Sequence, residues 1–180
     1  PAQCGAVAPS AAMKTLWAPW RMEHVDGSAN RADGCIFEPP GETASDKEHL
    51  LLFRDRLLVV LLNRFPYANG HLLVAPRRHV AEITELTREE QAALMTLLGF
   101  SSQMLRRRLH AEGINIGLNL GACAGAGIPG HLHFHVVPRW PGDHNFMTVL
   151  ADIRTIPQHI EESFDLLVPD FLQYLAHGPS

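Results

Sequence analysis

Three histidines, His131, His133 and His135, alternate with apolar residues in the segment HLHFHVV (131–137). Side chains on a β-strand point alternately to the two faces of a sheet, so a strand here places all three imidazoles on one face. The apolar residues between them then face the protein core. Imidazole is partly neutral near pH 7, and a neutral ring nitrogen is a nucleophile or a metal ligand. The spacing therefore predicts a chemical site.

Three interpretations of this strand remain open from the residues alone. The first is a polar sheet face that happens to carry histidines. The second is a zinc site, because His-x-His is a common ligand spacing. The third is nucleophilic attack by imidazole on phosphorus. The third is favoured because a glycine-rich loop (120–130) directly precedes the strand, and glycine lets backbone amides approach an anion closely.

The elements that position these histidines are expected to form an α+β fold, an antiparallel sheet with helices packed against it. Thr87 and Glu90 form a capping box that begins a long helix, and Gly113 is expected to stop it. A second amphipathic helix is expected around residues 157–168. Pro138 is expected to end the histidine strand. The predicted strands are residues 50–53, 57–62, 71–75, 114–119 and 131–137.

Length and composition limit the class of protein. The chain has 180 residues, 46% of them hydrophobic, and a formal net charge of −4, which fits one globular domain and disfavours a nucleic-acid partner. Three scattered cysteines disfavour a disulfide framework and favour a reducing compartment, with the cytoplasm as the expected location. The longest aliphatic run, 57–62, is too short to span a membrane. Residues 1–13 are expected to be a flexible tail and residues 14–176 a single domain.

The histidine segment and the loop before it resemble a known family. HLHFHVV fits the His-φ-His-φ-His-φ-φ pattern, where φ is apolar, of the histidine triad (HIT) superfamily of nucleotide hydrolases and transferases. Further segments are similar to one subgroup, the bacterial diadenosine tetraphosphate phosphorylase-like proteins, and the likeness covers roughly residues 14 to 170. These segments are TLWAPWRMEHV, GINIGLNLGACAGAGIPGHLHFHVVPRW, GDHNFM and IPQHIEESFDLL. The segment LNRFPYANGHLLVAPRRHV resembles the first hairpin and nucleotide-binding strand of the family as a whole.

The resemblance implies a fold, an assembly and an activity. The fold is a HIT-like five-stranded antiparallel sheet with one long and one C-terminal helix, and the assembly is a homodimer that joins two such sheets. The activity is cleavage of dinucleoside polyphosphates through a nucleotidyl-histidine intermediate, with diadenosine tetraphosphate phosphorylase first. The alternatives are a nucleoside phosphoramidase, another nucleotide hydrolase, or a protein that binds nucleotides without turnover. The chemistry requires no cofactor.

The resemblance also assigns roles to the three histidines. His133, the middle one, corresponds to the nucleophile. His135 corresponds to the histidine on the phosphate or ribose side of the substrate, and His131 to a supporting one.

Two further residues match positions that bind substrate in the family, and a third position departs from the family pattern. Asn63 matches a position that contacts the nucleoside, although it is also suited to beginning a turn. Asn119 matches a polar position beside the phosphates and ribose, although it is also suited to ending a strand. Many relatives carry a polar side chain just before the first histidine, whereas this chain has GIPG (127–130). Phosphate binding is therefore expected to rely on backbone amides such as that of Gly127.

A structural zinc is also implied, with a departure from the family pattern. Many relatives have a Cys-x-x-Cys pair in the early loop that binds zinc together with two histidines. Here Cys35 is kept and Glu38 takes the second position. Glutamate is a zinc ligand too, so a site of Cys35, Glu38, His79 and His131 is expected, and a plain buried Cys35 is the alternative.

Overall fold

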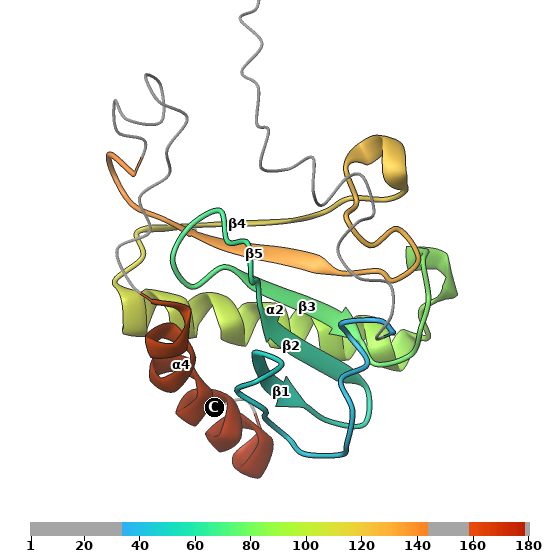
Figure 1. Ribbon diagram of the computed structural model, residues 1–180, viewed down its shortest axis with the longest axis horizontal. Helices are drawn as coiled ribbons and strands as arrows, with labels where there is room; N and C mark the ends of the chain where they lie inside the picture. Colours follow the sequence, from blue (N-terminus) through green and yellow to red (C-terminus); the bar gives the residue numbers. More distant parts are fainter. Residues whose placement is uncertain (1–33, 144–158, 179–180) are drawn as a thin grey trace, which may run out of the picture.

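The computed structural model describes residues 34–143 and 159–178 of the chain. These residues form one five-stranded antiparallel sheet in the order β1-β2-β3-β5-β4 (Figure 1). The α+β class and the arrangement of one long and one C-terminal helix are confirmed. The elements are β1 (Leu51–Arg54), β2 (Leu58–Leu62), β3 (Leu72–Pro76), the 3₁₀ turn η3 (Ile83–Glu85), α2 (Arg88–Leu109), β4 (Gly113–Leu118), the 3₁₀ turn η4 (Ala122–Ala124), β5 (Phe134–Arg139) and α4 (Ile160–His177).

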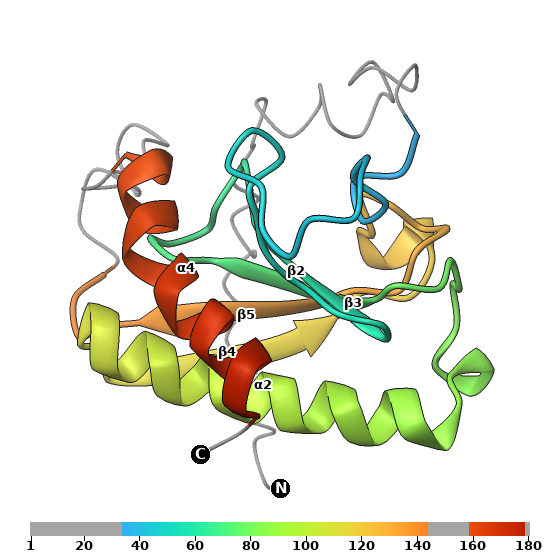
Figure 2. The ribbon, with the colours of Figure 1, turned by 90° about the horizontal axis from the view of Figure 1, so that it is seen from below.

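Different parts of the chain pack against the two faces of the sheet. One face forms the main core with α2 and α4, and includes Val74, Val136 and Phe171. The opposite face packs a smaller cluster, with Leu73 and Phe37 among its members. Figure 2 shows α2 along one side of the sheet and the segment of residues 34–50 over the other side. The histidines belong to this second face, away from the helices.

The long helix begins where the sequence predicts and ends earlier. The Thr87 side chain accepts a hydrogen bond from the Glu90 amide, and the Glu90 carboxylate caps the Thr87 amide in return. The expected stop at Gly113 is wrong, because α2 ends at Leu109 and Gly113 is the first residue of β4. His110 takes the left-handed conformation that closes the helix, with φ 52°, a role usually filled by glycine or asparagine.

The C-terminal helix is longer than expected. The range 157–168 anticipates its first half, whereas the observed helix runs to His177 and contains Pro169 in its interior. Proline ordinarily disrupts a helix, but buried residues hold the helix against the core on both sides of this one, with Leu167 before it. Phe171 is fully buried in the core, and Asp170 forms ion pairs with Arg107 and Arg108 of α2.

The histidine strand starts and ends later than expected. β5 begins at Phe134, so His131 and His133 precede it. The β3–β5 ladder ends at the pair Val74 and Phe134. Continuing its register would place Leu132 opposite Pro76, which has no amide proton for a ladder bond. The Leu132 amide instead donates to the Val80 carbonyl at 2.6 Å.

Pro138 does not end β5 but lies inside it, paired with Ile114 of β4. β3 pairs with β5 only as far as Val136, so this end of β5 has β4 as its described neighbour. A missing amide is tolerated where a strand is paired on one side.

Two other expectations fall wholly or partly on residues that are not described. The tail at residues 1–13 lies outside the described residues, as do residues 14–33 and 144–158 of the expected domain. The domain boundaries therefore stay predictions. Within residues 34–143 and 159–178, no helix is both long enough and apolar enough to cross a membrane.

Candidate active site

The three histidines share one face although only His135 lies within β5. His131 and His133 are almost completely buried, at 1% and 5% exposure. The Phe37 ring packs against both, with ring centroids 4.9 Å from His131 and 5.0 Å from His133. The rings of His133 and His135 are 5.1 Å apart in an edge-on arrangement. The alternation of side chains thus persists beyond the hydrogen-bonded strand.

His133 has the chemistry of a nucleophile. Its Nδ1 lies 2.8 Å from the backbone carbonyl oxygen of His131. A carbonyl only accepts, so Nδ1 carries the proton and Nε2 of the neutral ring keeps a lone pair. Burial lowers the pKa of His133, and the bond to the His131 carbonyl only partly offsets this. The neutral, nucleophilic form is therefore the favoured one near pH 7.

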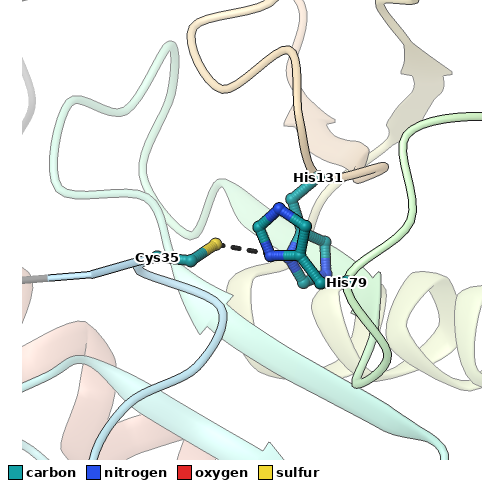
Figure 3. A group of neighbouring side chains, drawn as sticks. All are labelled: Cys35, His79 and His131. Carbon is teal, nitrogen blue, oxygen red and sulfur yellow. Dashed lines mark hydrogen bonds between the residues drawn. The ribbon is translucent and has the colours of Figure 1, made fainter.

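His131 faces another group of residues. Its Nε2 donates to the carbonyl oxygen of Pro76 at 2.8 Å, which leaves Nδ1 directed at Cys35, with Sγ at 3.2 Å. Burial is the main cause that lowers the pKa of His131. One ligand atom from each of Cys35, His79 and His131 lies within 4.8 Å of the others (Figure 3). This is a suitable group for a metal ion.

The ligand atoms of Cys35, His79 and His131 suit zinc, but Glu38 does not occupy the ligand position expected for it. Thiolate and imidazole are the preferred zinc ligands. The carboxylate of Glu38 contacts Nδ1 of His79, with Oε1 at 2.9 Å, and does not belong to the group of three ligand atoms. Carboxylates often orient metal-binding histidines in this way. Burial raises the pKa of the Cys35 thiol, so a bound cation would be needed to stabilise its thiolate.

Asn63 is connected to the triad histidines through His71, a residue that the sequence did not indicate. Its Oδ1 accepts from the Phe65 amide at 3.0 Å, and its Nδ2 lies 3.2 Å from Nδ1 of His71. His71 in turn has its Nε2 3.0 Å from Nδ1 of His135. His71 shares a face with Leu73 by strand alternation, but only the pairing of β3 with β5 reveals that it reaches His135.

Asn119 and the glycine-rich loop lie at the end of β4. The last described pair between β4 and β5 is Leu118 with Phe134, so Asn119 falls at the next position in register, opposite His133. Its Nδ2 donates to the carbonyl oxygen of Gly125 at 3.4 Å. Gly127 is exposed in the same loop. The roles of Asn119 and Gly127 in phosphate binding stay predictions.

A buried arginine that the sequence did not indicate holds the early loop, which contains Phe37, Pro39 and Thr43, against the face of the sheet that carries the histidines. Arg54 of β1 donates to the carbonyl oxygen of Pro39 at 2.8 Å, and twice to that of Thr43, at 3.0 and 2.8 Å. These bonds hold the loop that carries Phe37 on the sheet. A lone arginine beside an apolar strand has no pattern that reveals such a role.

Comparison with known proteins agrees with this geometry. The HIT domain family model matches residues 44–142. The chain is 36% identical over 165 residues to the AP-4-A phosphorylase of Mycobacterium tuberculosis, which covers 88% of this chain and 85% of that protein. It is 33% identical over 93 residues to the asymmetrical bis(5'-nucleosyl)-tetraphosphatase of Schizosaccharomyces pombe, covering 52% of this chain and 50% of that one.

A solved structure of a zinc-bound histidine triad family protein from Mycobacterium smegmatis is also similar. It superposes with a TM-score of 0.57 and 31% identity, over 71% of this chain and 86% of that one. The family model spans more than half of this chain, and the Mycobacterium tuberculosis relative spans nearly all of it. The predicted resemblance is therefore confirmed, and the chain belongs to the HIT domain family.

Proposed function

We propose that this chain is a nucleotidyltransferase that cleaves dinucleoside polyphosphates, with diadenosine tetraphosphate as substrate and inorganic phosphate as acceptor. The observation that carries the proposal is the hydrogen bond from Nδ1 of His133 to the His131 carbonyl, because it leaves a lone pair on Nε2. The AP-4-A phosphorylase relative, similar over nearly the full length, supports this substrate and acceptor.

The reaction proceeds in two displacements at one phosphorus atom. Nε2 of His133 attacks the α-phosphorus, an N–P bond forms, and the bridging P–O bond breaks to release ATP. An oxygen of inorganic phosphate then attacks the same phosphorus, the N–P bond breaks, and ADP leaves. Amides of the glycine-rich loop and the side chain of Asn119 stabilise the charge on the phosphoryl oxygens. Asn63 and the turn after it hold the nucleoside side of the substrate.

A product assay tests this function and its alternatives. The purified chain is incubated with diadenosine tetraphosphate, with and without inorganic phosphate, and the nucleotides are separated by charge. ADP plus ATP formed only with phosphate supports the phosphorylase. AMP plus ATP in both tubes indicates an asymmetrical hydrolase. No turnover in either tube points to a phosphoramidase, tested with a nucleoside phosphoramidate, or to nucleotide binding alone.

The proposal includes a structural zinc held by Cys35, His79 and His131, with Glu38 orienting His79. Cys35, His79 and His131 would hold a zinc ion between the early loop, the segment after β3 and the histidine segment, where its role would be structural. The three converging ligand atoms and the zinc-bound Mycobacterium smegmatis relative support it. Metal analysis of the purified chain, with Cys35→Ser as comparison, tests it: about one equivalent is expected in the parent and a strong loss in the variant.

The proposal also includes a homodimer in which two β4 strands meet edge to edge. β4 stands at the end of the strand order, and Ile116 in its middle is 46% exposed. An exposed strand edge with an apolar side chain favours pairing with another strand. Light scattering on the parent and on Ile116→Lys distinguishes a dimer from a monomer. Among the described residues, Cys35 and Cys123 form no disulfide, which supports the cytoplasm as the compartment.

A further inference from the structure

A fourth histidine, His71, is completely buried beside the three of the triad, with 0% exposure. It lies between two other rings, with its centroid 4.8 Å from that of Tyr67 and 5.2 Å from that of His135. A buried imidazole with defined partners at both nitrogens has a defined proton position. The partners of His71 therefore determine which of its nitrogens carries hydrogen.

Nδ1 of His71 is a hydrogen-bond acceptor. The backbone amide of Tyr67 lies 3.1 Å away and is only a donor. The Asn63 side chain approaches the same nitrogen with Nδ2 at 3.2 Å. Its orientation is set independently, because its Oδ1 accepts from the Phe65 amide. With Nδ1 accepting, the ring is neutral and its proton sits on Nε2.

The proton on Nε2 of His71 is directed at His135. The two nitrogens, Nε2 of His71 and Nδ1 of His135, are 3.0 Å apart. Nδ1 of His135 must then accept, which places the proton of the neutral His135 ring on Nε2. The neighbouring nucleophile is in the opposite form, because the Nδ1 proton of His133 is held by a carbonyl. Of these two adjacent rings, His133 thus presents a lone pair on Nε2, and His135 presents an N–H donor on Nε2.

We propose that His71 is a positioning residue that holds His135 in the Nε2-protonated form. His135 then offers an N–H donor to an oxygen of the phosphoryl group that His133 attacks. In the opposite form its Nε2 would present a lone pair to that anionic oxygen, which is repulsive. The effect on turnover rests on the proposed function, whereas the proton position on His135 does not.

Two substitutions of similar polarity separate the roles of the two nitrogens of His71. In His71→Gln the side-chain amide nitrogen falls near the place of Nε2, so the donor to His135 is kept. In His71→Asn the side chain ends near the place of Nδ1, so the contact with the Tyr67 amide is kept and the donor is lost. His177→Gln, at the end of α4, is the matched control for replacing a histidine.

The measurement is ¹⁵N NMR of the histidine rings in the full chain, without substrate, with signals assigned by single-histidine variants. In the parent and in His71→Gln, His135 is expected with a bare Nδ1 and a protonated Nε2. In His71→Asn it is expected to populate the Nδ1-protonated form. A parent His135 protonated on Nδ1 overturns the proposal without any variant, as does a His71→Asn spectrum in which His135 keeps the parent form.

Turnover gives the second readout. The kcat of His71→Asn is expected to fall roughly ten- to a hundredfold with little change in KM, and that of His71→Gln to stay within about threefold of the parent. Equal kcat values in the two variants overturn the catalytic part of the proposal. If the parent turns over no dinucleotide but its His135 shows the expected proton position, the proposed function fails and the role of His71 stands.

Discussion

The guanidinium of Arg78 donates two hydrogen bonds to the buried carboxylate of Glu90. Nε lies 3.0 Å from Oε1, and Nη2 lies 2.9 Å from Oε2. Arg78 directly precedes His79 of the proposed zinc site, and Val80 follows and accepts from the Leu132 amide. Glu90 belongs to the first turn of α2. The pair therefore fastens the segment that supports the histidines to the long helix.

This pair predicts a pH-dependent stability. The bonds from Arg78 are the largest cause that lowers the pKa of Glu90 from 4.5 to about 2. Because the folded pKa is depressed, the stabilisation is complete above pH 4.5 and is lost as the pH falls toward 2. Glu90→Gln should reduce the unfolding free energy by on the order of 2–3 kcal/mol at pH 7.

Urea unfolding at pH 7 and at pH 3 measures this effect. The difference between parent and Glu90→Gln should shrink at the lower pH. Glu89→Gln is the matched control, because Glu89 is exposed and pairs with Arg56 at the surface. It should change stability by no more than about 0.5 kcal/mol. A Glu90→Gln difference that is equal at both pH values argues against the ion pair as its source.

A side chain at Gly70 is expected to destabilise the fold. Its φ of 75° is in the left-handed region, and an added Cβ would clash with Cδ1 of Leu109, so the Leu109 side chain would have to shift. Gly70→Ala should therefore destabilise the fold by roughly 2–4 kcal/mol, from backbone strain and overpacking together. Gly142 has the same φ but open space around it, so Gly142→Ala should cost only about 1 kcal/mol. Equal costs in thermal unfolding would show that the contact with Leu109 has no effect.

Arg54 is expected to control the order of the loop over the histidines. Arg54→Met keeps the apolar stem but leaves the carbonyls of Pro39 and Thr43 without their donors, at a cost of about 2–3 kcal/mol. Hydrogen exchange should quicken in residues 35–46 and stay slow in β3. Arg56→Met, at an exposed position two residues after Arg54, is the control. Protection of the loop that is unchanged in Arg54→Met would refute the anchoring role.

Glu38 is expected to tune zinc binding without being essential for it. Glu38→Gln weakens the support for His79 and should lower zinc affinity about tenfold to a hundredfold, while one equivalent still binds. Competition with a chromophoric chelator measures the affinity. Glu42→Gln is the control, because Glu42 pairs with Arg77 away from the ligand atoms. Abolished binding in Glu38→Gln would instead make Glu38 a direct ligand.

Periodicity predicted the shared histidine face, and local signals predicted the start of α2, because both depend on residues near one another in sequence. The alternation from His131 to His135 survives even where the ladder stops. The stop itself depends on Pro76, which only the pairing of β3 with β5 brings opposite Leu132. The end of α2 was missed because His110 takes a conformation that glycine usually provides.

The unpredicted parts of the site depend on contacts between distant segments. His71 and His135 are 64 positions apart and meet only because β5 inserts between β3 and β4. The zinc ligands were expected through the family resemblance alone, since no spacing connects Cys35 to His131. The place of Glu38 beside His79 is a matter of side-chain geometry, which the sequence pattern does not contain.

The most direct test of the proposed mechanism is to trap the covalent intermediate. The chain is mixed with diadenosine tetraphosphate without inorganic phosphate, quenched in alkali within milliseconds to seconds, and digested for peptide mass spectrometry. One AMP group bonded to His133 is expected; it should be absent in His133→Ala and should leave as ADP when phosphate is added before the quench. Turnover at the parent rate in His133→Ala, or an AMP group on another residue, would contradict this mechanism.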